Sequence, residues 1–416
     1  MLDILGPGLI TGAADDDPSG IATYSQAGAQ FGFQLAWTML LTFPLMVVIQ
    51  GISARIGRTT GRGIAANIRS EYPAPLLHGA VLLVFVANIC NIGADLGAMA
   101  ESARLLVPAV STPLYLCAFG CICAGGQIFL NHTRYVAILK WLTLSLFAYV
   151  ATLMVVHVAW RDILQGLFWP HFSAKKDFWL MVVAVLGTTI SPYLFFWQAS
   201  QEVEDTKTEP VREPLRRKPS QGVSALARIK WDTVMGMGIS NAVALAIMAT
   251  AAATFHAKGI LQLKSAAQAA EALRPLAGSF AFVLFALGIV GTGLLAVPVL
   301  AGSAAYALGE ARRWPVGLSR NPSEAKAFYT TIAAATAVGA IANVLHVSPL
   351  KALVWSAALN AIAAGPLMVL VMRLGANRRL MGQFTVRGPW LALGWGATGV
   401  MALASVAFLD SLVMNR

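Results

Sequence analysis

The chain has 416 residues, of which 57% are hydrophobic and only 12% charged, and its mean hydropathy is +0.67. Soluble globular domains carry about 25% charged residues, so this composition excludes a soluble domain and favours a membrane protein. The net charge of +11 does not indicate a nucleic-acid partner, because the basic residues lie in short connections between apolar runs, as expected of cytoplasmic loops.

Apolar runs of about 20 residues, long enough to cross the hydrocarbon core as helices, recur along the whole chain. They predict an all-α polytopic membrane protein, surrounded by lipid, with about eleven spans. In chain order the expected spans are Leu5–Gln30, Ala36–Ile52, Leu76–Ser102, Pro113–Phe129, Tyr135–Trp160, Phe178–Ser200, Trp231–Phe255, Phe280–Leu308, Phe328–His346, Leu350–Leu374 and Trp390–Met414.

Lysine and arginine concentrate in one set of alternate connections, including residues 55–69 and 207–230. Positive connections face the cytoplasm, so we expect an inner-membrane protein with its N-terminus cytoplasmic and its C-terminus external. The longest polar stretch, Gln201–Lys230, is rich in proline and mixed charge, and it is expected to be a flexible cytoplasmic loop. The whole chain would then form one transmembrane domain.

Two smaller features complete the outline. The connection His256–Arg274 is rich in Ala, Gln and Lys and predicts a short amphipathic helix on the external side. The cysteines fall inside apolar runs without metal-ligand spacing, so we interpret them as small core residues; they are Cys90, Cys117, Cys121 and Cys123.

The first span is interrupted in its middle, where it reads GAADDDPSG from Gly12 to Gly20. Proline lacks an N–H and disfavours helical geometry in the preceding residue, while glycine permits unwinding. Each of Asp15, Asp16 and Asp17 would cost about 3 kcal/mol at the centre of a lipid-facing helix. These carboxylates must therefore face protein, water or a cation, and intramembrane acids are usually functional.

The sixth span has the same pattern, reading GTTISPY from Gly187 to Tyr193. A lone Ser-Pro within a span usually marks only a kink, but the pairing with the first break favours function. Breaks five helices apart predict two inverted repeats, at residues 4–160 and 178–374, with an extra helix at 390–414. Unwound carbonyl groups are good ligands for hard cations, so we expect a cation site where the breaks meet.

At these two breaks, and at Gly6-Pro7-Gly8, the sequence resembles the Nramp (natural resistance-associated macrophage protein) family. Here the family's Asp-Pro-Gly-Asn motif reads Asp17-Pro18-Ser19-Gly20, and its Met-Pro-His motif reads Ser191-Pro192-Tyr193. The resemblance spans essentially the whole chain. It implies a leucine-transporter-like fold, and a divalent metal that is the transported substrate of a monomer rather than the cofactor of an enzyme.

The resemblance also implies where the metal binds. The family's aspartate ligand maps to Asp17, its asparagine to Gly20 and its methionine to Ser191, and the two carbonyl ligands map to Ala14 and Thr188. Serine in place of methionine removes the soft thioether that favours Mn, Fe and Cd. Glycine in place of asparagine removes another ligand. A roomy all-oxygen site suits Mg²⁺, which keeps several of its waters, and the pattern looks like the Nramp-related magnesium transporters.

We therefore expect uptake of Mg²⁺, and also Mn²⁺, by alternating access. The family's helix-6 histidines map to Tyr193 and Gln198, and its helix-3 acidic pair maps to Asp95 and Ala98, so few proton-relaying groups remain. Weak or absent proton coupling follows. The alternatives are a proton-coupled Mn²⁺/Fe²⁺ transporter and an organic-solute transporter of the same fold, although the aspartates would repel a substrate carboxylate.

Further polar residues are candidates for the ion pathway. They are Asp15, Asp16, Tyr193, Asn91, Asp95 and Asn360. Asn91 and Asp95 lie one turn apart and can face the same cavity. Asn360 either lines the site or bonds across helices, and the second is more common. Asp232 is interpreted as a cap at the start of the seventh span. A membrane-embedded hydrolase is disfavoured, because no histidine has ligand spacing or a nucleophile beside it.

Overall fold

The computed structural model describes residues 7–129, 147–156, 160–173, 175–208, 211–343 and 349–413, and this part of the chain is helical with no strand. The longer helices are α3 (Trp37–Thr60), α5 (Ala74–Leu106), α6 (Thr112–Phe129), α12 (Gly222–Thr254), α15 (Ala281–Arg312), α16 (Lys326–Ala342), α17 (Pro349–Ala376) and α19 (Pro389–Val413). The broken ones are α1 (Pro7–Asp15) with α2 (Pro18–Phe31), and α10 (Lys176–Thr189) with α11 (Pro192–Thr208).

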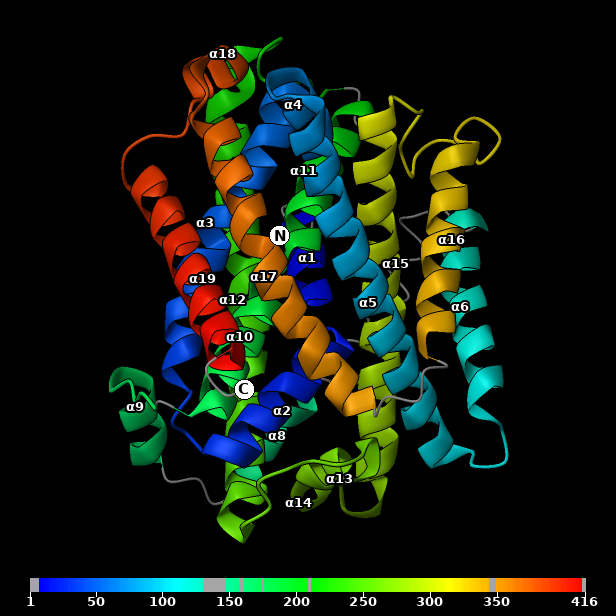
Figure 1. Cartoon of the computed structure of the whole chain (residues 1–416), viewed down its shortest axis with the longest axis vertical. Coiled ribbons are helices and arrows are strands. Elements are labelled where there is room, and N and C mark those ends of the chain that lie inside the picture. The colour runs from blue at the N-terminus through cyan, green and yellow to red at the C-terminus, as the bar shows by residue number, and fades with distance from the viewer. Residues whose placement is uncertain are drawn as a thin grey trace.

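Shorter helices occupy the two ends of the bundle. At one end lie α4 (Ile64–Glu71) and α18 (Arg378–Met381), and at the opposite end lie α13 (Ala266–Ala270) and α14 (Arg274–Ala277) (Figure 1). The remaining short elements are α8 (Phe147–Val155), α9 (Trp160–Phe168), η3 (Pro219–Gln221), η4 (His256–Lys258), η5 (Glu271–Leu273), η6 (Gly278–Phe280) and η8 (Gly382–Phe384). A short helix in the connection 256–274 is thus confirmed.

Within the described residues, 8 helices are long and apolar enough to cross a membrane. With the broken α1–α2 pair and the shorter α16, they match every predicted span but one. Of the predicted fifth span, residues 135–146 and 157–159 lie outside the described part. Leucines on the outer surface, such as Leu82 and Leu403, are largely exposed. The chain is a multi-pass membrane protein.

Both predicted breaks are present. Asp17 has extended backbone geometry (φ −70°, ψ 170°) and caps α2, whose first residue is Pro18. Proline's missing N–H costs nothing at the first position of a helix, where that N–H would have no partner within the helix. The Asp17 carboxylate accepts a hydrogen bond from one of the free backbone amides of the first turn. In the sixth span, Ile190 leaves the helical region (φ −119°, ψ 58°) and Pro192 begins α11 in the same way.

Small residues allow the broken helices to pack at the centre of the bundle. A Cβ on Gly12 of α1 would lie 2.3 Å from a carbonyl oxygen of α12, and one on Gly187 of α10 would lie 2.0 Å from a carbonyl oxygen of α17. Only glycine permits such close approach of two helix backbones. The breaks are therefore held inside the protein, with α12 and α17 against them.

The expectation of a flexible loop over Gln201–Lys230 is wrong for much of that stretch. Helix α11 continues to Thr208, α12 begins at Gly222, and the buried Glu202 carboxylate accepts a 2.5 Å bond from Arg228. The described residues between them are tied to the end of α3, since the Leu215 N–H donates to the Arg58 carbonyl (3.1 Å). Buried charge pairing and backbone hydrogen bonds, which polarity alone does not reveal, order this segment.

Two other interpretations are corrected. Asp232 is buried and does not cap its own helix; its Oδ2 accepts from the Gly8 N–H (2.7 Å) and so caps α1 from the side of α12. Of the cysteines, only Cys123 is buried. The others lie on the outer surface of α5 and α6, where an apolar environment outside the protein suits a thiol as well as the core does.

Candidate cation site at the two helix breaks

Asp17 lies at the centre of the first break and is 1% exposed. Its Oδ1 accepts hydrogen bonds from the Ser19 hydroxyl (2.7 Å) and the Gly20 N–H (2.7 Å). Its Oδ2 accepts from the Asn91 side-chain amide of α5 (3.3 Å). The carboxylate is thus fixed by the first turn of α2 and by one polar side chain from a neighbouring helix, at the positive end of the α2 dipole.

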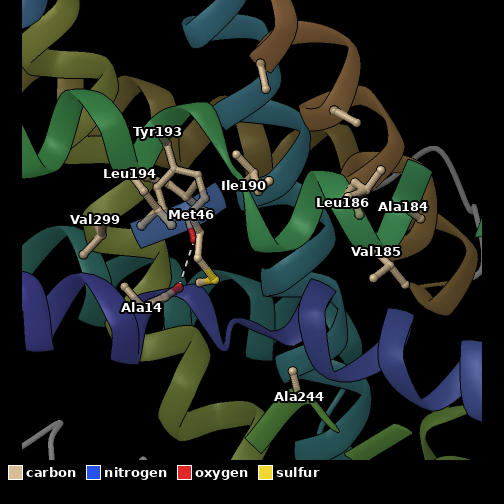
Figure 2. Packing of buried hydrophobic residues seen from close by; sticks show 14 of the residues in the cluster. Ala14, Met46, Ala184, Val185, Leu186, Ile190, Tyr193, Leu194, Ala244 and Val299 are labelled. Carbon is tan, nitrogen blue, oxygen red and sulfur yellow. Dashed lines mark hydrogen bonds between the residues drawn. The ribbon is translucent and has the colours of Figure 1, made fainter. Parts of the chain in front are cut away.

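The structure brings the two breaks together. The Ser19 hydroxyl lies 3.3 Å from the Thr188 hydroxyl of α10. On the other side, the Tyr193 hydroxyl at the start of α11 donates to the Ala14 carbonyl at the end of α1 (2.9 Å), and Figure 2 shows this bond between the helix ends beside the two breaks. Residues 14–20 and 188–193, far apart in sequence, therefore form one polar region inside the membrane-spanning bundle.

Several of the expected ligand groups are occupied by internal hydrogen bonds. The Ser191 hydroxyl lies 2.7 Å from the Gly187 carbonyl oxygen and 3.0 Å from that of Thr188 and donates to one of them, and the Ala14 carbonyl accepts from Tyr193. Gly20 contributes only its backbone N–H, to Asp17. Among the described residues, no group of three His, Cys, Asp or Glu side chains is close enough to hold a metal ion. A cation at this site would be held mainly by Asp17, carbonyl groups and water.

Asp15 and Asp16 are buried but face a different helix. The Ser240 hydroxyl of α12 lies 2.9 Å from Asp15 Oδ2 and 3.2 Å from Asp16 Oδ1. A hydroxyl has one proton and can donate to only one of the two carboxylates at a time. These acids therefore flank the Asp17 region from α12. Ser240 was missed from the sequence, because an isolated serine in an apolar span gives no signal.

Asp95 lies one turn after Asn91 on α5 and is fully buried. Its carboxylate interacts with that of Asp17, and the Ser19 backbone amide lies nearby. Among the described residues, however, no donor is placed to form a hydrogen bond with either Asp95 oxygen. A buried carboxylate without partners is costly. The structure thus places Asn91 and Asp95 beside Asp17 on one face of α5, as their spacing predicted.

Asn360 of α17 is also fully buried, and within the described ranges neither polar atom of its amide has a hydrogen-bond partner. No hydrogen bond connects it to either break in that part of the chain. Other neighbours of the site escaped the sequence analysis. Thr11 of α1 donates to the Gln198 side chain, and Met46 of α3 is buried in the same cluster as Ala14 and Tyr193 (Figure 2).

Comparisons with known proteins agree with this architecture. The family model of natural resistance-associated macrophage protein-like proteins matches residues 8–411. The divalent metal cation transporter MntH of Deinococcus radiodurans is 26% identical over 404 residues, covering 95% of this chain and 86% of the relative. The MntH of Aeromonas hydrophila is 28% identical over 396 residues, covering 92% and 89% of the two chains.

Solved structures show the same fold at low sequence identity. The Eremococcus coleocola manganese transporter, in complex with an aromatic bis-isothiourea substituted compound, has a TM-score of 0.80 at 16% identity and covers 99% of this chain and 87% of its own. Mhp1, a nucleobase-cation-symport-1 family transporter, has a TM-score of 0.63 at 16% identity and covers 99% and 91%. The expected leucine-transporter-like fold is confirmed, and the relatives are transporters rather than enzymes. On the match across 8–411, the chain belongs to the natural resistance-associated macrophage protein (Nramp) family.

Proposed function

We propose that this protein carries a divalent metal cation across a membrane by alternating access, with Asp17 as the principal ligand. The observation that carries the proposal is the meeting of the two breaks at Asp17. The Ser19 hydroxyl contacts both Asp17 and Thr188, so a charged group and the unwound carbonyl groups of α1 and α10 share one buried region. The names of the MntH relatives support a divalent metal as the substrate.

Mg²⁺ is the proposed physiological ion, with Mn²⁺ also transported. Gly20 offers no side-chain ligand and Ser191 offers only oxygen, so the ligands carried over from the family are all hard. Transport mainly of Mn²⁺ is the second candidate. It is favoured by the Eremococcus coleocola manganese transporter among the structural relatives, and by Met46, whose thioether from α3 could replace the sulfur that Ser191 lacks.

Proton coupling is proposed to be weak or absent. Tyr193 and Gln198 of α11 occupy the positions where the family has histidines in its sixth span. The Gln198 side chain already accepts a hydrogen bond from Thr11. Asp95 of α5 is the one acid that remains of the pair that the family carries in its third span. The driving force would then be the metal gradient and the membrane potential, which is worth about 2.3 kcal/mol per elementary charge at 100 mV.

The placement in the membrane is also a proposal. The end carrying α4 and α18 bears Arg62, Arg69, Arg378 and Arg379, and we assign it to the cytoplasm by the excess of basic residues. The end carrying α13 would be external, as would the C-terminus, in the inner membrane of the cell. The functional unit is taken to be a monomer.

Ion flux into proteoliposomes tests the substrate and the coupling together. Purified protein should transport Mg²⁺ and Mn²⁺ saturably in a panel with Ca²⁺ and Cd²⁺, and an internal pH dye should report no acidification in step with the metal. Protein-free liposomes are the blank, and a variant with Asp177→Asn, in the first turn of α10 away from the break, is a charge control. Flux of Mn²⁺ and Cd²⁺ without Mg²⁺ would favour the second candidate, and one proton per ion would contradict the uncoupled mechanism.

A further inference from the structure

The segment that carries α13 is held across one end of the bundle by two side chains. The Gln26 amide of α2 donates to the Leu261 carbonyl (3.0 Å) and accepts from the Leu263 N–H (2.9 Å), as a neighbouring strand would. The Glu101 carboxylate of α5 accepts from the Ala266 N–H (3.0 Å). The helices that bear the site residues Asp17 and Asp95 therefore also hold this cover.

A small cavity lies beneath α13. Its volume is about 10 Å³, roughly the space of one water molecule, and Ser25, Glu101 and Ser102 contribute its polar wall. The Ser25 and Ser102 side chains are at most 1% exposed, and across the described ranges neither hydroxyl has a hydrogen-bond partner. Buried hydroxyl groups in native proteins are nearly always hydrogen-bonded, so both of these groups are available to bind a ligand or a water in the cavity.

The cavity lies between the Asp17 site and the covered end. Ser25 follows Asp17 along α2 by a rise of about 12 Å, and Ser102 follows Asp95 along α5 by about 10 Å, at 1.5 Å per residue. The step from Asp95 to Ser102 is two helical turns, so both side chains lie on the same face of α5. That face therefore carries Asp95 near the break and Ser102 near α13.

We propose that Glu101, Ser25 and Ser102 form an outer site for a hard divalent cation, which the ion occupies on its way between the α13 side and Asp17. The proposal rests on the proposed function. A carboxylate with two hydroxyl groups is an all-oxygen ligand set, which suits Mg²⁺ and Mn²⁺. A single negative charge binds weakly enough to release the ion, as successive sites along a pathway require. An arriving cation would take Glu101 from the Ala266 N–H and so loosen α13.

The substitution Glu101→Gln separates this role from a purely structural one. Glutamine keeps an oxygen that can accept from the Ala266 N–H but removes the charge. In an Asp17→Asn background, where binding at the inner site is about 100-fold weaker, Mn²⁺ binding measured from the free-ion EPR signal should persist weakly. Adding Glu101→Gln should weaken that residual binding about tenfold, the effect of losing one contact with a charged group. The matched control is Glu271→Gln, a partly exposed carboxylate paired with Arg274 beside α13.

The pair Ser25→Ala and Ser102→Ala gives a second measurement, should Glu101→Gln not fold. It should weaken residual binding without changing the charge. Residual Mn²⁺ binding equal in the Asp17→Asn protein with and without these changes would overturn the outer site. The proposed function is judged separately: it fails if Asp17→Asn transports normally, whereas loss of transport in Asp17→Asn with no effect at Glu101 removes only the outer site.

Discussion

The substitution Asp17→Asn removes the charge at the meeting point of the breaks while leaving the packing in place. Its Oδ1 can still accept from Ser19 and the Gly20 N–H, which hold the first turn of α2. The new Nδ2 would face the donating amide of Asn91. The Asn91 Oδ1, however, has no donor within the described ranges, so this amide can turn and accept instead. The fold should therefore survive.

The expected loss is in metal affinity. Two unit charges 4 Å apart interact by about 4 kcal/mol at an effective dielectric constant of 20, and a divalent ion doubles this. Dehydration of the ion and of the carboxylate offsets part of the gain. A net loss of about 3 kcal/mol corresponds to roughly 100-fold weaker binding.

The half-saturating Mn²⁺ or Mg²⁺ concentration for flux into proteoliposomes measures this loss, and thermal unfolding in detergent checks the fold. We expect a rise of about 100-fold, or loss of saturation in the accessible range, with an unfolding temperature close to that of the unchanged protein. An unchanged half-saturating concentration in a folded variant would show that Asp17 does not hold the ion, and the proposed mechanism would be wrong.

Three further substitutions have definite expectations. Ser191→Met should shift the preference from Mg²⁺ toward Cd²⁺ by about tenfold in competition flux assays, since it supplies a soft ligand; an unchanged ratio would mean that position 191 does not face the ion. Arg228→Ala should lower stability by about 3 kcal/mol, because it removes the hydrogen-bonded cation from the buried Glu202 carboxylate. In detergent melting, the double variant Glu202→Gln/Arg228→Ala should recover part of that loss. Gly28→Ala should cost about 1–3 kcal/mol in the same assay, since its Cβ would lie 2.1 Å from a backbone oxygen of α12; Gly79→Ala, which meets open space, is the control and should be neutral.

The sequence by itself determined the helices and the positions of the breaks, because both depend on local chemistry. Apolar runs long enough to span a bilayer can satisfy their backbone only as helices. The GAADDDPSG and GTTISPY segments combine proline and glycine with several polar side chains, whereas the lone Gly365-Pro366 pair lies inside the continuous helix α17. Asn91 and Asp95 could be assigned to one face of α5 from spacing alone.

Only the tertiary structure decided which side chains meet. Ser240 of α12 lies beside Asp15 and Asp16, and Asp232 caps α1. Glu202 pairs with Arg228. Nothing local in the sequence indicates any of these contacts. Each is a contact between residues far apart in the chain, and its existence depends on how closely the helices approach. That approach is set by glycines such as Gly187, whose partner helix is unknown until the bundle is assembled.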